Sequence, residues 1–97
     1  MTLYRQGDLL IRKIVKVPEK TVKKTDNIVL EGEATGHMHR LIGGDILLAD
    51  ARMFLHVPEI GKIIHEEHNP IPLERGDYEV IRQRQYKSEN MTELVID

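Results

Sequence analysis

The 97-residue sequence predicts an all-β fold, a small single-domain barrel or two-sheet roll of about seven or eight short strands over residues 1–97. Three observations predict it. Turn-forming residues recur every ~8–12 positions, the segments between them are rich in Ile, Leu and Val, and no segment carries a helical apolar stripe over three turns. We expect the sheet to close because an open sheet this small leaves unpaired edges that promote aggregation.

The N-terminal third predicts two strands and a weaker one between them. The apolar run 8–17 predicts a strand that Pro18 ends. The polar segment 20–26 predicts a loop or a weak edge strand. Residues 27–33 predict a strand in which Gly32 is a candidate bulge.

The remaining strands are predicted from the positions of glycine and proline residues, which mark the turns between them. Gly43-Gly44 lies between two β-like runs, 37–42 and 45–50, which is typical of a hairpin. The segments that follow are expected to be a strand at 51–57, a turn at 58–61, a strand at 62–68 ended by Asn69-Pro70, a turn at 74–77, a long strand at 78–86 and a last short element at 91–97.

The composition narrows the classes of function. Cysteine is absent, which excludes disulfides and thiolate chemistry and predicts a reducing, cytoplasmic location. The N-terminus has no signal-peptide pattern and no apolar run approaches the ~20 residues of a membrane span. The net charge of −2 makes the whole chain a poor polyanion binder, so any nucleic-acid affinity requires a local patch. A chain this small would also gain core by forming a homodimer.

Four of the five histidines fall in two tight pairs, in Gly36-His37-Met38-His39-Arg40 and in His65-Glu66-Glu67-His68. If the first segment is extended, His37 and His39 share one face with their Cα atoms about 6.6 Å apart. His65 and His68 converge only if the strand kinks or ends between them, and Asn69-Pro70 favours an ending there. The fifth histidine, His56, is expected to be an ordinary surface residue.

Arginine and tyrosine alternate on the late strand, where one face carries Tyr78, Val80, Arg82, Arg84 and Tyr86. Arginine is a permanently charged, forked donor suited to phosphate. Tyrosine can stack on a base. This face therefore predicts a phosphate-binding surface, with Arg40 as a weaker candidate because it points away from His39. The alternative is an exposed strand whose arginines pair with glutamates.

The segment His37-Met38-His39 in a small β protein resembles the first motif of cupins, and the later segment 72–78, PLERGDY, is similar to the turn of the second cupin motif. The resemblance implies a divalent metal bound by His37 and His39 inside a barrel. The sequence departs from the family because no glutamate follows His39 at the expected spacing, the nearby acid being Asp45. No histidine follows Tyr78 either. The whole pattern also resembles small uncharacterised bacterial and phage proteins.

Two enzymatic or metal-binding hypotheses follow. The first is a metal-free phosphodiesterase or ribonuclease acting on RNA or cyclic oligonucleotides, with His37 or His39 as base and His65 or His68 as acid. In that hypothesis the substrate-binding residues are Arg82, Arg84, Tyr86 and Arg40. The second is a divalent metal centre for Zn, Mn, Ni or Fe, in which the ligands come from His37, His39, His65, His68 and Glu66 or Glu67.

A third hypothesis is a non-enzymatic interaction module. The coincidence of a histidine cluster with an arginine face favours the first hypothesis over the second by a small margin. Both require that the segment 65–68 faces the segment 36–40 in the folded protein.

Overall fold

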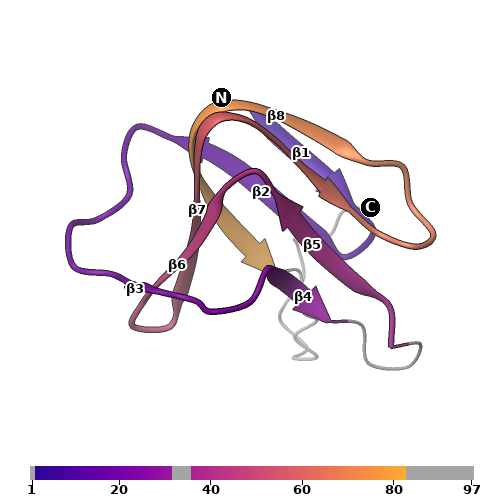
Figure 1. Ribbon diagram of the computed structural model, residues 1–97, viewed down its shortest axis with the longest axis horizontal. Helices are drawn as coiled ribbons and strands as arrows, with labels where there is room; N and C mark the ends of the chain where they lie inside the picture. The colour runs from indigo at the N-terminus through magenta and orange to yellow at the C-terminus, as the bar shows by residue number, and fades with distance from the viewer. Residues whose placement is uncertain (1, 32–35, 83–97) are drawn as a thin grey trace, which may run out of the picture.

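The structure is a computed structural model that describes residues 2–31 and 36–82. Within these ranges the chain forms one antiparallel sheet and no helix. The prediction of an all-β fold with seven or eight strands is confirmed (Figure 1). The strands in chain order are β1 (Leu3–Gln6), β2 (Leu9–Ile14), β3 (Val22–Lys23), β4 (Ile28–Glu31), β5 (Met38–Ile42), β6 (Asp45–Ala49), β7 (Arg52–Ile64) and β8 (Ile71–Arg82).

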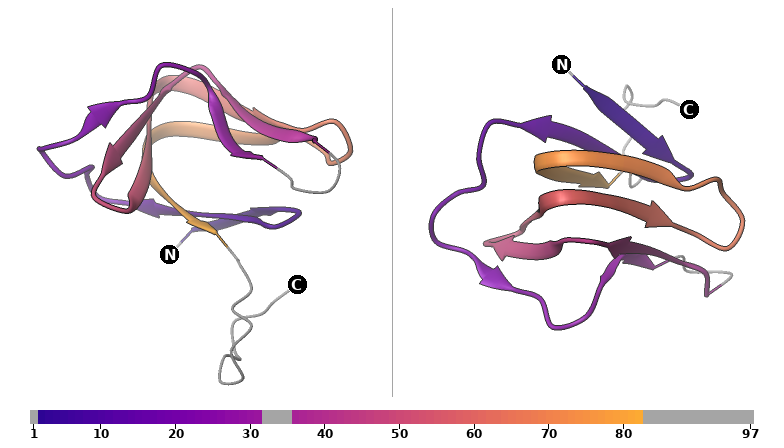
Figure 2. Two further views of the ribbon diagram at one scale, coloured as in Figure 1. Left: turned by 90° about the horizontal axis from the view of Figure 1, so that it is seen from below. Right: turned by 45° about the horizontal axis from the view of Figure 1, so that its top comes forward.

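The strands follow the order β1-β2-β8-β7-β5-β4, and β6 pairs with both β7 and β3. The sheet curls into a half-barrel, so β4 and β5 arch over β1 and β2 (Figure 2). Curling of this kind is how a small sheet buries one face around its own core. Among the residues that the structure describes, no helix is long and apolar enough to cross a membrane.

The core is mainly aliphatic, because the strands are rich in Ile, Leu and Val. Its fully buried members come from every long strand and include Leu9, Ile11, Leu55, Val57, Ile63 and Leu73. Tyr78 is also fully buried, and its hydroxyl donates to the backbone oxygen of Glu74 at 2.6 Å. The first part of the predicted arginine–tyrosine face therefore belongs to the core.

Strands β7 and β8 are longer than the sequence predicts, because the turns expected at 58–61 and 74–77 are not formed. The pairing slips between Val57, opposite Gly76, and Ile60, opposite Glu74, which is a β-bulge. Proline has no N–H to leave unpaired, so Pro58 fits this bulge. The turn-forming residues bend the two strands together instead of ending them (Figure 1). The segment similar to the second cupin turn is thus continuous strand.

The hairpin predicted at Gly43-Gly44 is also wrong. Strands β5 and β6 do not pair with each other; they pair one after the other with two successive parts of β7, 62–64 and 52–56. The two glycines cross the bend of β7 so closely that a Cβ on Gly43 would lie 2.5 Å from the backbone oxygen of Ile60, and one on Gly44 would lie 2.6 Å from that of His56. Glycine is required here for close backbone approach and not for chain reversal.

Candidate functional site: a histidine cluster beside the β7–β8 hairpin

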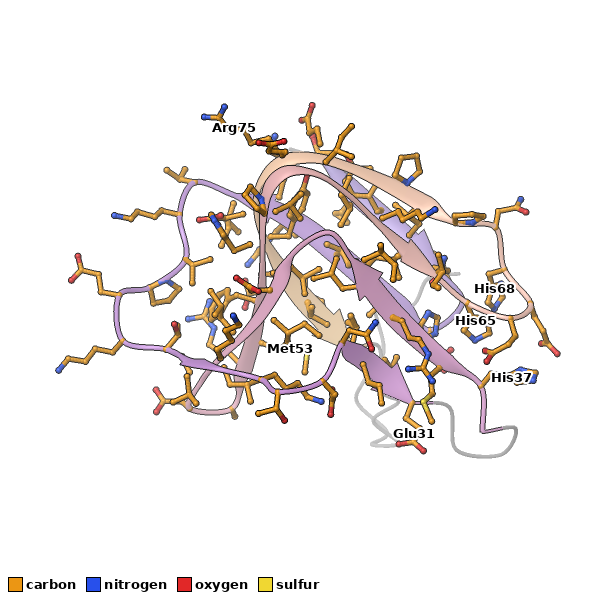
Figure 3. All side chains as sticks on the ribbon, in the orientation of Figure 1. Glu31, His37, Met53, His65, His68 and Arg75 are labelled. Atoms are coloured by element: carbon orange, nitrogen blue, oxygen red, sulfur yellow. The ribbon has the colours of Figure 1, made fainter. Side chains whose placement is uncertain are left out.

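Four histidines meet at one end of the half-barrel. His39 is on β5 and His37 directly precedes this strand, and His65 and His68 come from the loop that joins β7 to β8. Figure 3 labels His37, His65 and His68 at this end of the molecule. The ring centroids are 4.3 Å apart for His39 and His65, 4.6 Å for His65 and His68, and 5.6 Å for His37 and His65. We call these four residues the histidine cluster. The two sequence segments do face each other.

Strand pairing explains how the cluster forms. Arg40 on β5 pairs with Ile64, the last residue of β7, so the residues that precede Arg40 lie beside those that follow Ile64. His37 and His39 both reach the ring of His65, so they lie on one side of the chain, as their spacing predicts. The predicted strand 62–68 ends at Ile64 instead, which places both His65 and His68 in the loop and lets their rings converge.

Gln6, the last residue of β1, fixes the imidazole of His39. Both residues are buried, with 3% of Gln6 and 4% of His39 exposed. The Gln6 Nε2 group donates to the backbone oxygens of Ile63 at 3.1 Å and Asn69 at 2.7 Å. The Gln6 Oε1 atom lies 2.7 Å from His39 Nδ1 and must accept there. Nδ1 of His39 therefore carries the proton, and Nε2 keeps its lone pair.

Burial, followed by the nearby imidazoles of His65 and His68, lowers the pKa of His39 from 6.5 to about 4. Burial also lowers the pKa of His65, again with a contribution from His68. Closely packed imidazoles disfavour one another's protonation because two positive charges would repel at this separation. The buried half of the cluster is therefore neutral at pH 7, which is the form that binds metals.

The depressed pKa of His39 predicts how stability depends on pH when a chelator is present. Between pH 6.5 and 4, His39 is protonated in the unfolded chain but remains neutral in the folded chain. The free energy of unfolding should therefore fall as the pH falls through this window, by at most about 3 kcal/mol from His39. Denaturant titrations at several pH values measure the slope. His39→Gln should flatten it, and an unchanged slope in that variant would contradict the assignment.

A carboxylate joins the cluster. Potential ligand atoms of His37, His65 and Glu66 all lie within 4.8 Å of one another. The Glu66 Oε1 atom accepts the backbone N–H of Met38 at 3.2 Å, which ties the loop to β5. The backbone N–H groups of Glu66 itself and of Met38 lower the pKa of the Glu66 carboxyl, so it is ionised at neutral pH. Glu67 instead lies 3.4 Å from His37 Nδ1 and outside this group of three.

His65 has the opposite tautomer from His39. The backbone N–H of Glu67 donates to His65 Nδ1 at 3.0 Å. In the neutral ring the proton of His65 is therefore on Nε2. The cluster thus places an imidazole with a free Nε2 lone pair beside one whose Nε2 carries hydrogen.

The turn between β1 and β2 forms one wall of the cluster. Gly7 has a φ of +61°, and a Cβ at this position would lie 2.7 Å from Nε2 of His68. Asp8, the next residue, acts electrostatically on His39 and raises its pKa, against the larger effect of burial. The segment Gln6-Gly7-Asp8 therefore shapes the cluster, although its residue types alone do not predict that role.

We expect Gly7→Ala to displace His68. Alanine at a left-handed backbone position costs about 1–2 kcal/mol, and its methyl group would meet the imidazole. Gly36→Ala is the matched control, since Gly36 has a φ of +77° and nothing within 4 Å of its Cβ position. Both variants should lose similar stability in denaturant titrations. Only Gly7→Ala should shift the NMR signals of the His68 ring, and equal ring spectra for the two would refute this contact.

Among the predicted phosphate-binding residues, Arg40 is the one whose side chain lies in the described part of the chain, and it does not join the cluster. Arg40 contacts Asn27 Oδ1 at 3.4 Å and the sulfur of Met38, and it follows His39 on the opposite face of β5. Arg82 is the last residue of β8, and its side chain is outside the described part of the chain. Arg84 and Tyr86 also lie outside the described residues.

Comparisons with known proteins identify a family but no function. Neither a search of curated proteins nor a search of solved structures finds a match. A family model described as a domain of unknown function (DUF8820) matches residues 5–83, which include Gln6, Gly7, Glu66 and the whole histidine cluster. The chain belongs to this DUF8820 family.

Proposed function

We propose that the histidine cluster is a divalent metal centre in which His37, His65 and Glu66 bind a transition metal ion such as Zn²⁺, Mn²⁺, Ni²⁺ or Fe²⁺, and that the protein is a metal-dependent hydrolase. The observation that carries this proposal is the convergence of three potential ligand atoms within 4.8 Å. Two imidazoles and one carboxylate form a ligand set that zinc hydrolases and non-haem iron enzymes both use.

Three protein ligands leave coordination positions open, as in catalytic and not in structural sites. When bound, a divalent ion supplies an activated water at neutral pH. This chain would contribute His39 as a neutral neighbour, because its Nδ1 proton is held by Gln6 and its Nε2 remains an acceptor. Such hydrogen bonds fix the tautomer and ring orientation of histidines in metal sites. Phosphodiesters such as RNA and cyclic oligonucleotides are the substrate class that we would test first.

Calorimetric titration of chelator-treated protein with ZnCl₂ and MnCl₂ tests the proposal. We expect one equivalent to bind and the melting temperature to rise, because an ion that binds only the folded state stabilises it. The Glu67 amide resonance should shift, since ligation through either nitrogen of His65 disturbs the bond from that amide: Nδ1 either becomes the ligand or takes up the ring proton. Absence of binding, or binding that leaves the Glu67 amide unchanged, would overturn the assignment.

The second candidate is metal-free acid–base cleavage of phosphodiesters. It is favoured by the complementary tautomers of His39, an acceptor at Nε2, and His65, a donor at Nε2, whose ring centroids are 4.3 Å apart. A base and an acid are the two groups that cleavage through a 2′-hydroxyl requires. Cleavage of labelled RNA in EDTA that His39→Gln abolishes would establish this candidate. Cleavage only with added metal would return the histidines to ligand roles.

A further inference from the structure

A second arrangement of polar groups lies at the bend of β7 and β8, away from the histidine cluster. His56 on β7 pairs with Asp77 on β8, and the His56 Nδ1 atom lies 2.7 Å from Asp77 Oδ1. Figure 3 shows the neighbouring Arg75 at the top of the view and the labelled cluster histidines at the right. The sequence alone assigns His56 only a surface role.

Asp77 holds the imidazole of His56 in one orientation. The second oxygen of Asp77 accepts the backbone N–H of Val17 at 2.9 Å, so both carboxylate oxygens are engaged. The Asp77 side chain is only 14% exposed, whereas that of His56 is 47% exposed. A carboxylate that accepts at Nδ1 fixes the ring and leaves Nε2 directed away from it. Nε2 is therefore available to a ligand from solvent.

An open cavity of about 520 Å³ lies beside this pair. The cavity is lined by polar and apolar residues of β7 and β8 and of the chain after β2. They include His56, Val57 and Pro58 from β7, Arg75 and Asp77 from β8, and Val15. It lies at the β-bulge, where Pro58 is on the bulged strand. Bulges occur often beside active sites because they redirect side chains.

We propose that this cavity binds a small phosphate monoester, with Arg75 and Nε2 of His56 contacting its phosphate and Val15 and Pro58 contacting its organic part. Arginine is the side chain best suited to a phosphate group. Val15 is fully exposed in the structure and offers apolar surface to a ligand. This second site is independent of the metal centre.

Proton chemistry favours phosphate over carboxylate as the ligand. A phosphate monoester has its second pKa near 6, so it shares a proton readily with an imidazole at neutral pH. A phosphate monoester can therefore offer either an acceptor oxygen or a hydroxyl donor to Nε2 of His56. A carboxylate has lost its proton at this pH and provides only an acceptor. Phosphate also has enough oxygens to contact the arginine and the imidazole together.

Calorimetry and NMR of the whole protein with phenyl phosphate, inorganic phosphate and benzoate test the site. We expect phenyl phosphate to bind more tightly than the other two and to shift the His56 ring signals. Arg75→Gln and His56→Gln should each weaken its binding by about 10-fold or more, as loss of a charge-assisted hydrogen bond implies. Lys62→Gln, which removes one positive charge elsewhere on β7, should leave it unchanged.

The side chains of His56 and Arg75 are both exposed, so the two variants at these positions should fold normally. No binding of phenyl phosphate to the wild-type protein would overturn the proposal, and so would equal binding by all three variants. Preference for benzoate would overturn the phosphate assignment. All these titrations contain EDTA, which removes divalent ions. Their result therefore does not depend on the proposed metal centre.

Discussion

His65→Ala is expected to weaken the binding of Zn²⁺ by about 100-fold or more, since even residues behind the ligands of a metal change affinity by about 10- to 100-fold. His65 contacts each of the other three cluster histidines and belongs to the group of three converging donors. Its side chain is only partly buried in a loop, so the variant should still fold. Calorimetric titration of the chelator-treated variant measures the loss.

The adjacent glutamates provide a matched control. Glu66→Gln should weaken metal binding to a similar degree, because an uncharged amide is a poor ligand for these ions. Glu67→Gln makes the same chemical change one residue away, outside the group of three donors, and should weaken binding much less, since Glu67 acts only through its 3.4 Å contact with His37. Equal losses in the two variants would indicate a general electrostatic effect of the loop and would contradict the proposed ligand set.

Gln6→Met should lower the free energy of unfolding by about 3–4 kcal/mol. The substitution keeps the size of the side chain but leaves the oxygens of Ile63 and Asn69 and the Nδ1 proton of His39 without their partner. Each unsatisfied buried group costs about 1–3 kcal/mol, and the bonds to Ile63 and His39 are the buried ones, whereas Asn69 is exposed to water. The melting temperature should fall by roughly 15 °C or more for a chain of this size. Thermal and denaturant unfolding measure the change.

Lys20→Met is the control for Gln6→Met, since it introduces methionine at an exposed position and should leave stability nearly unchanged. A second variant, Gln6→Glu, tests the two hydrogen bonds that the Gln6 amide donates. Gln6→Glu should destabilise the protein, because an ionised carboxylate has no hydrogen to donate to two backbone oxygens. If Gln6→Glu were as stable as the wild type, the two hydrogen bonds that the Gln6 amide donates would contribute nothing measurable to stability, which would contradict the role given to Gln6.

The sequence predicts the fold class well because every long strand is rich in Ile, Leu and Val and no segment has helical periodicity. It misplaces the turns because the same residues that end strands also bend them. Pro58 and Gly76 lie at a bulge inside β7 and β8, and Gly43-Gly44 crosses that bend. Whether such residues reverse or bend a strand depends on pairing with distant segments, which local propensity does not contain.

The site was predictable in part. The spacing of His37 and His39 predicts that they share one side of the chain, and the structure brings both to His65. The convergence of His65 and His68 follows from the end of β7 at Ile64, earlier than the expected break at Asn69-Pro70. The role of Gln6 was not predictable, because a lone glutamine at the end of an unpredicted strand becomes a partner of His39 only through long-range pairing. The Asp77–His56 pair was missed for the same reason, since its two members are joined by the register of β7 and β8.

We propose that the histidine cluster binds a divalent ion through His37 and His65 while Gln6 holds the Nδ1 proton of His39. Long-range ¹H–¹⁵N spectra of the histidine rings, recorded in EDTA and after one equivalent of Zn²⁺, test both parts at once. We predict the Nδ1–H tautomer for His39 before and after addition, and large ¹⁵N shifts for His37 and His65 on addition. Ring nitrogens that do not respond to Zn²⁺, or an Nε2–H tautomer for His39, would contradict the account.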